Sequence, residues 1–149
     1  PRSGQRSLRI VFNAPSALGF DNVSQLVPVE PQARYRLEFW VRTQGLKSAS
    51  TLVTTVSDSA EPARPLATSS AVPPGTNDWQ QVGFEFTTLA KTEAVTVRIN
   101  RAPCAEDMCP IFGLVWYDNF NLQRIAAADP GAPAGSDEPG GAARAAGIR

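Results

Sequence analysis

The sequence contains no histidine. This absence removes the Ser-His-Asp and Cys-His nucleophile systems and the usual ligand sets of zinc sites. A pair of carboxylates of the kind that glycosidases use, or a lysine nucleophile, remains open. The composition therefore favours a protein that is not an enzyme.

Unbalanced charge, lysine and long apolar runs are also lacking. The 14 basic and 14 acidic residues cancel, so no long-range field attracts nucleic acid or an anionic membrane. Lysine is nearly absent, and no run approaches the roughly 18 apolar residues of a membrane span. No charged-then-apolar leader precedes the first strand-like segment, and the chain begins at Pro1, which we interpret as processing or excision from something larger. We expect neither a nucleic-acid partner nor membrane insertion.

Cysteine occurs twice, as Cys104 and Cys109 within Cys-Ala-Glu-Asp-Met-Cys. A zinc site needs four ligands, and a reactive redox motif has two intervening residues where this chain has four. The pair is interpreted as a local disulfide that stabilises a loop by about 2 kcal/mol, or as two free thiols. A disulfide would indicate an oxidising compartment, which is the periplasm, the cell surface or the extracellular space.

Short apolar runs separated by turn residues fill the chain from residue 7 to residue 125. Alternation predicts strands at 7–12, 23–30, 35–42, 51–57, 79–88, 94–101 and 113–125. Seven short strands at this spacing are typical of an all-β antiparallel β-sandwich or jelly roll, so residues 1–125 are predicted to form one domain.

The last 24 residues, 126–149, differ in composition, since 17 of them are alanine, glycine or proline. Such a segment buries too little apolar surface to offset the entropy of ordering it. We interpret it as a low-complexity tail or linker.

Each of three predicted strands has one apolar and one polar face, because successive side chains of a strand point to opposite sides. The inward sets are Tyr35, Leu37, Phe39 and Val41, then Val82, Phe84 and Phe86, then Val95, Val97 and Ile99. The outward sets are Arg36, Glu38, Trp40 and Arg42, then Gln81, Gly83 and Glu85, then Thr96, Arg98 and Asn100. A polar face that carries a tryptophan suits a polar ligand, and it is also what an ordinary solvated sheet presents.

Four motifs follow one another in an order that resembles a known family. They are Ser7-Leu-Arg-Ile-Val, Tyr35-Arg-Leu-Glu-Phe-Trp-Val-Arg, Asp78-Trp-Gln-Gln with Phe86-Thr-Thr, and Trp116-Tyr-Asp-Asn-Phe-Asn-Leu. Residues 3–124 resemble carbohydrate-binding modules with the galactose-binding-like jelly-roll fold, which are often appended to xylanases and glucanases. The resemblance implies a concave sheet whose aromatic side chains stack on sugar rings beside amide and charged groups that bind hydroxyls.

Carried over by position, the resemblance makes Trp40 the stacking residue. The hydrogen-bonding residues that it implies are Arg36, Glu38, Arg42, Gln81, Glu85, Arg98 and Asn100. Alternatively, a neighbouring segment covers Trp40 and the indole has no ligand. Trp79 and Trp116 are expected to have structural roles.

The resemblance also implies a structural Ca²⁺ where the first and last strands meet. The matching acidic residue is Asp118, with main-chain oxygens expected around residues 3–5. Calcium takes six to eight oxygen ligands, and one carboxylate can suffice when carbonyls supply the others. Alternatively, Asp118 caps the turn before Asn119.

Three functions are compatible with the sequence. The first is a non-catalytic, carbohydrate-binding-like module that tethers a larger exported protein to polysaccharide or glycan. The alternative is a structural or protein-interaction domain of a cell-surface or envelope assembly, with other subunits as partners and no sugar ligand. The third is hydrolysis by the pair Glu38 and Glu85, which we do not expect, because the resemblance indicates a module that accompanies such enzymes.

Overall fold

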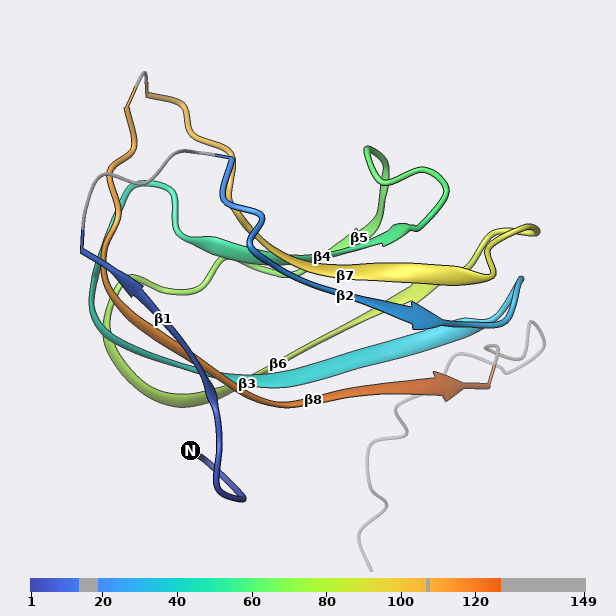
Figure 1. The fold of residues 1–149 in the computed structure, drawn as a ribbon, viewed down its shortest axis with the longest axis horizontal. Coiled ribbons are helices and arrows are strands. Elements are labelled where there is room, and N and C mark those ends of the chain that lie inside the picture. Colours follow the sequence, from blue (N-terminus) through green and yellow to red (C-terminus); the bar gives the residue numbers. More distant parts are fainter. Residues whose placement is uncertain (14–18, 107, 127–149) are drawn as a thin grey trace, which may run out of the picture.

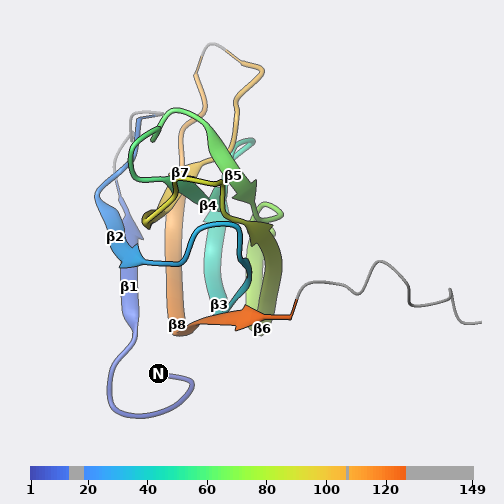
Figure 2. The same ribbon diagram turned by 90° about the vertical axis from the view of Figure 1, so that its right-hand side faces the viewer.

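The computed structural model describes residues 1–13, 19–106 and 108–126, which form two antiparallel four-stranded sheets (Figure 1). Sheet A has the order β1 (Leu8–Phe12), β8 (Phe112–Ile125), β3 (Arg34–Lys47) and β6 (Gly75–Thr87), which Figure 2 shows from left to right. Sheet B has the order β2 (Val23–Pro28), β7 (Ala94–Arg101), β4 (Leu52–Asp58) and β5 (Pro65–Thr68). The predicted β-sandwich is confirmed. Nowhere in these described ranges is there a helix long and apolar enough to cross a bilayer.

The core lies between the two sheets, where the predicted apolar faces meet. Phe39 and Leu37 of β3 are 1 % and 2 % exposed, and Val95 of β7 is fully buried. Val82 and Phe84 of the edge strand β6 are half-buried and pack against the same core. The alternation of apolar and polar residues therefore predicted the inward side chains of these three strands correctly.

The strands of the structure differ most from the predicted ones in three places. β3 continues to Lys47 rather than ending at residue 42, and β6 begins at Gly75 rather than at residue 79. The two strands pair throughout these extensions, but the register shifts on either side of Thr43. Bulges of this kind break the period of two on which the prediction rests. β5 was not predicted, because it has four residues and begins with a proline, which is tolerated at the start of an edge strand.

A further bulge in β8 redirects side chains next to the centre of sheet A. Trp40 pairs with Asp118, whereas Glu38, two residues earlier, pairs with Asn121. The extra residue is accommodated at Asn119, whose φ of 53° lies in the left-handed region that asparagine tolerates. This bulge brings Asp118 and Asn119 into contact with the N-terminal segment.

The outer faces of the two sheets point in opposite directions. In Figure 1, the loop that connects β4 to β5 and the loop that connects β7 to β8 both rise above sheet B, so the outer face of sheet B lies between them. The last strand, β8, ends at Ile125, and the domain boundary after this residue stays a prediction. The predicted tail, residues 126–149, lies outside the described residues except for Ala126.

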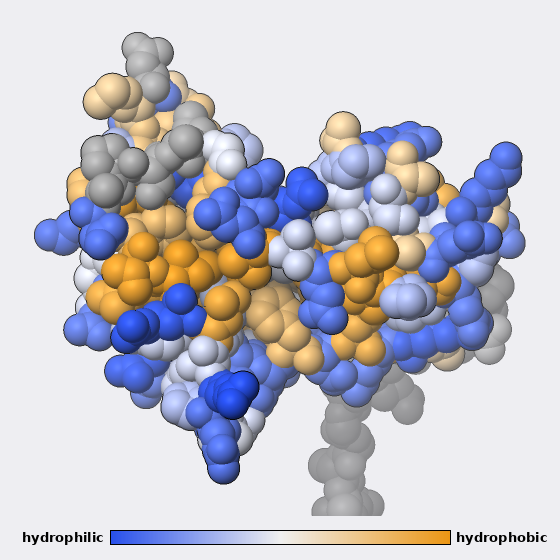
Figure 3. Space-filling model, in the orientation of Figure 1, coloured by the Kyte–Doolittle hydropathy of each residue, from blue (hydrophilic) through white to orange (hydrophobic). Residues whose placement is uncertain are grey.

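An apolar hollow of about 380 Å³ opens between the sheets, beside the edge strands β1 and β2. Its apolar lining includes Leu8 of β1, Val23 of β2 and Phe120 of β8. Figure 3 shows hydrophobic side chains gathered between the sheets on this side of the molecule. Leu8 and Phe120 are 39 % and 43 % exposed, so the two sheets do not close completely over the core at this edge.

Candidate functional site

The eight ligand-binding residues predicted from the sequence do not form one surface. Six of them lie on β3 and β6 of sheet A, namely Arg36, Glu38, Trp40, Arg42, Gln81 and Glu85. Arg98 and Asn100 lie on β7 of sheet B, on the opposite outer face. Alternation in a strand defines which side chains point outward, but it does not define to which of two sheets the strand belongs. The sequence predicted that all eight residues lie on one sheet face. The structure shows that they lie on two separate faces.

On the outer face of sheet A, the charged side chains bind one another. The Arg36 Nε–H donates to Glu38 Oε1 at 2.8 Å, and Arg36 Nη1 donates to Glu85 Oε1 at 3.4 Å. Glu85 also accepts a hydrogen bond from Arg34. The hydrogen bond and the charge of Glu38 raise the pKa of Arg36 above its ordinary value. Both carboxylates of the conceivable catalytic pair are thus engaged in surface ion pairs.

Gly83 of β6 leaves room for the ion pairs of Arg36 with Glu38 and Glu85 to lie flat on the sheet. It pairs with Glu38, and a Cβ at this position would approach Arg36 Nη2 to 3.3 Å. The lack of a side chain therefore lets the Arg36 and Glu38 side chains cross β6.

The Trp40 ring is covered by the N-terminal segment. The guanidinium carbon of Arg2 lies 3.4 Å from the centre of the Trp40 ring, which is the geometry of a close cation–π contact. Trp116, which the sequence did not identify as a surface residue, lies beside Arg42 on the same face, with a separation of 5.3 Å. The alternative in which a neighbouring segment covers Trp40 is the arrangement that the structure shows, so a sugar could reach this ring face only by displacing Arg2.

Asp118 holds that N-terminal segment through main-chain donors. Its Oδ2 accepts hydrogen bonds from the N–H of Arg2 at 2.7 Å and of Ser3 at 3.4 Å. Its Oδ1 accepts from the N–H of Asn119 at 2.7 Å. Burial alone would raise the pKa of Asp118, but the three N–H donors outweigh it and hold the pKa below its ordinary value.

The contacts of Asp118 do not fit the expected calcium site. The groups that face its two oxygens are N–H donors, whereas a calcium site needs six to eight oxygen ligands around the ion. No group of three or more acidic, cysteine or histidine side chains with metal-binding geometry occurs within the described ranges. These contacts favour the alternative in which Asp118 caps the turn before Asn119. The bound calcium remains a prediction.

Replacing Asp118 by asparagine is expected to release the N-terminal segment. An asparagine side chain turns one acceptor oxygen into an NH₂ group, which faces N–H donors and cannot bind them. Cleavage by trypsin after Arg2 and Arg6, followed by mass spectrometry, should become about tenfold faster, which corresponds to roughly 1.4 kcal/mol for lost bonds to a charged acceptor. Because the folded-state pKa is lowered, the wild-type segment should be released only as the pH falls through that pKa, below the ordinary range of aspartate.

Asp78 provides the matched control for this experiment. Its Oδ1 accepts from the N–H of the next residue, Trp79, just as Asp118 does with Asn119, but it has no described contact with the N-terminal segment. Asp78→Asn should therefore leave cleavage after Arg2 unchanged. Equal rates for both variants would show that Asp118 does not hold the segment.

A small polar pocket of about 80 Å³ lies on the outer face of sheet B. Two cross-strand pairs form its floor, Thr55 with Arg98 and Ser57 with Thr96. The residues that line it are Thr55, Ser57, Pro62, Pro65, Thr96, Arg98 and Asn100. Asn100 Nδ2 donates to Thr55 Oγ1 at 2.6 Å, whereas the hydroxyls of Ser57 and Thr96 have no hydrogen-bond partner in the described part of the chain. The sequence identified Arg98, Asn100 and the outward direction of Thr96, but not the contribution of β4.

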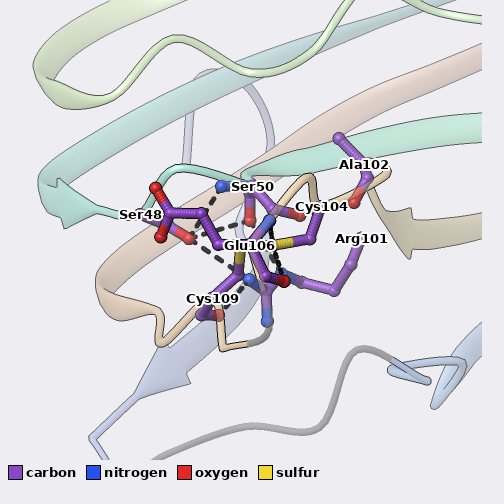
Figure 4. Close-up of a disulfide and its surroundings, with 7 residues drawn as sticks. All are labelled: Ser48, Ser50, Arg101, Ala102, Cys104, Glu106 and Cys109. Atoms are coloured by element: carbon purple, nitrogen blue, oxygen red, sulfur yellow. Dashed lines mark hydrogen bonds between the residues drawn. A yellow bond between two sulfur atoms is a disulfide. The ribbon is translucent and has the colours of Figure 1, made fainter.

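The predicted disulfide joins Cys104 and Cys109 in the loop between β7 and β8 (Figure 4). Arg101, which is 7 % exposed, anchors this loop to the end of β7. Its guanidinium donates to the carbonyl of Ser50 at 2.8 Å, to the hydroxyl of Ser48 at 3.2 Å and to the carbonyl of Cys109 at 2.6 Å. A disulfide is compatible with the expected oxidising compartment.

The sequence matches no protein-family profile and no curated protein. Solved structures match in fold. A structure described as a CBM4, a carbohydrate-binding module, superposes with a TM-score of 0.53 at 13 % identity, over 68 % of this chain and 59 % of that one. The EclA C-terminal domain, described as a sugar-binding protein, gives a TM-score of 0.58 at 7 % identity, over 81 % of this chain and 79 % of that one.

A third match is to the CBM22-1 and GH10 modules of the Clostridium thermocellum endo-1,4-β-D-xylanase 10B, complexed with xylohexaose. Its TM-score is 0.52 at 17 % identity, over 88 % of this chain and 24 % of the xylanase chain. This chain thus spans 59 % of the first structure and about a quarter of the third. The similarity is one of fold, and the resemblance to carbohydrate-binding modules noted in the sequence is confirmed at that level.

Proposed function

We propose that this domain is a non-catalytic carbohydrate-binding module and that sugar binds to the outer face of sheet B. The observation that carries the proposal is the contrast between the two outer faces. On sheet A the charged side chains bind one another and Arg2 covers Trp40, whereas the pocket on sheet B presents unused hydroxyl and guanidinium groups. Sugar hydroxyls need hydrogen-bond partners of this kind.

A loop beside sheet B favours the same face. The loop that connects β4 to β5 rises above sheet B (Figure 1) and contributes Pro62 to the pocket, so a ligand there would contact this loop as well as β4 and β7. None of the residues that line the pocket is aromatic, so hydrogen bonds rather than stacking would hold the ligand. An exported protein that contains this domain would thereby be tethered to a polysaccharide.

Replacing Thr96 by valine is expected to weaken sugar binding roughly three- to tenfold, because it removes one unpaired hydroxyl from the pocket at nearly constant shape. Thr87→Val makes the same chemical change on an exposed position of β6 in sheet A and should have no effect. Trp40→Ala should also leave binding unchanged. A glycan array followed by calorimetry on the ligands that bind would measure all three variants, with thermal unfolding as a check of folding.

Two outcomes would contradict this assignment. Loss of binding in Trp40→Ala with unchanged thermal unfolding would assign the ligand to sheet A, as the sequence predicted. No binding to plant, microbial or host glycans would remove the carbohydrate function.

The second candidate function is a protein-interaction domain, and one observation favours it. Leu8 and Phe120 expose apolar surface at the hollow between the edge strands β1 and β2. Exposed apolar patches of this kind often mark protein interfaces. If no glycan on the array binds, this hollow would be the surface on which to search for a protein partner.

A further inference from the structure

Among the described arginines of the two sheets, Arg98 is the one whose Nε is buried without a hydrogen-bond partner. Arg34, Arg36 and Arg124 each form an ion pair with a glutamate, and Arg101 donates to two carbonyls. Arg98 has no hydrogen bond and no ion pair to any described residue, and its Nε is buried without a partner. A buried N–H of a charged group that lacks an acceptor costs on the order of 1–3 kcal/mol.

The residues that line the pocket of Arg98 supply no negative charge. Hydroxyl, amide and proline side chains line the pocket, and none of its lining residues is an aspartate or glutamate. A ligand that carries an anionic group would provide the missing negative charge and would accept hydrogen bonds from the terminal nitrogens of the guanidinium, since the buried Nε itself is out of its reach. Hydrogen bonds between a guanidinium and a carboxylate are about twice as strong as those between neutral groups.

The volume of the pocket limits what enters it. At about 80 Å³ the pocket has less than a quarter of the volume of the apolar hollow between the sheets, and it suits a small group such as a carboxylate better than a whole pyranose ring. A sugar ring would therefore lie over the pocket, within reach of Asn100, and insert its carboxylate toward Arg98. The guanidinium is planar and matches the geometry of a carboxylate.

We propose that the pocket between β4 and β7 binds the carboxylate of an acidic sugar, so that the polysaccharide recognised by this domain contains uronic acid units. This inference rests on the proposed carbohydrate-binding function and specifies its ligand class. The zero net charge of the chain means that a polyanion is not attracted by the molecule as a whole, so Arg98 has to provide the selectivity locally.

The test compares polygalacturonic acid with its fully methyl-esterified form, which has the same backbone without the charge, and with neutral xylan. Calorimetry at two salt concentrations would be run on the wild-type domain, on Arg98→Met and on Arg42→Met. Arg42→Met removes the same charge from the exposed face of sheet A and is the matched control. We expect the wild type to bind the free acid at least tenfold more tightly than the ester, Arg98→Met to lose that preference, and Arg42→Met to keep it.

The possible failures are distinguishable. Equal affinity for acid and ester, or binding of neutral xylan that is unaffected in Arg98→Met, would overturn the acidic-sugar inference and leave the proposed function standing. Binding of sulfated but not of carboxylated polysaccharide would also overturn it. If none of these glycans nor any on the array binds, both proposals fail. Thermal unfolding of Arg98→Met close to that of the wild type establishes that a loss of binding is not a loss of fold.

Discussion

Replacing Gly113 by alanine is expected to lower the free energy of unfolding by about 4 kcal/mol. Gly113 has a φ of 117°, a conformation that costs other residues roughly 1–3 kcal/mol. A Cβ there would also lie 2.5 Å from the Gly45 carbonyl oxygen and 2.7 Å from the Leu46 Cα. Because these are main-chain atoms, no side-chain rotation relieves the clash, and overpacking adds roughly 1–3 kcal/mol. The melting temperature should fall by about 15 °C in a thermal scan.

Gly75→Ala separates the two contributions to this effect. Gly75 also has a positive φ, of 95°, but nothing lies within 4 Å of the position that a Cβ would take. It should therefore lose only the conformational part, roughly 1–3 kcal/mol. Equal destabilisation of the two variants would show that β8 moves away from the β3 bulge at no cost, contrary to the close packing described above.

Replacing Arg101 by methionine is expected to lower the free energy of unfolding by about 2 kcal/mol and to loosen the disulfide loop. The substitution keeps most of the buried volume but removes the donors that the carbonyls of Ser50 and Cys109 share. The buried carbonyl of Cys109 loses its donor, which costs roughly 1–3 kcal/mol, and the release of a buried charge offsets part of this. The carbonyl of Ser50 keeps the hydrogen bond that the Ser48 hydroxyl donates at 3.0 Å. Chemical unfolding would measure the loss, and hydrogen exchange between residues 102 and 111 would report the loosening.

Arg98→Met is the internal comparison, since Arg98 is on the same strand and has no described partner. Its free energy of unfolding should change by less than about 1 kcal/mol, or increase slightly. If the two variants lost equal stability, the hydrogen bonds of Arg101 would not be what stabilises the loop. The comparison also provides the stability control for the binding experiment on Arg98.

Sequence patterns identified the fold because its central strands alternate regularly. Tyr35 to Val41 show this most clearly, since every second side chain is buried against the opposite sheet. The same pattern could not predict β3 beyond residue 42, where bulges let Thr43 and Leu46 both reach the interior three residues apart. It could not predict β5 either, because four residues that begin with proline carry almost no periodic signal.

The candidate site was predictable in part, for a different physical reason. The outward direction of Arg98 and Asn100 follows from local alternation, but their separation from Trp40 depends on which strands pair across the whole chain. The contact of Arg2 with Trp40 likewise joins residues far apart in sequence and depends on the bulge at Asn119. No local pattern contains that information, so the single platform inferred from the sequence became two faces in the structure.

The pairing of β1 with β8 has a consequence for the order of events during synthesis. Leu8 pairs with Tyr117, so 109 positions separate the two partners along the chain. At roughly 5–20 residues per second, a ribosome needs about 5–20 s to make the segment that β1 requires, and sandwiches with such distant contacts fold slowly in any case. During that interval Ile10 and Phe12, which are buried in the finished domain, have no sheet to join. The short length of β1 and the charge of Arg9 within it limit how readily this unpaired strand can associate with another chain.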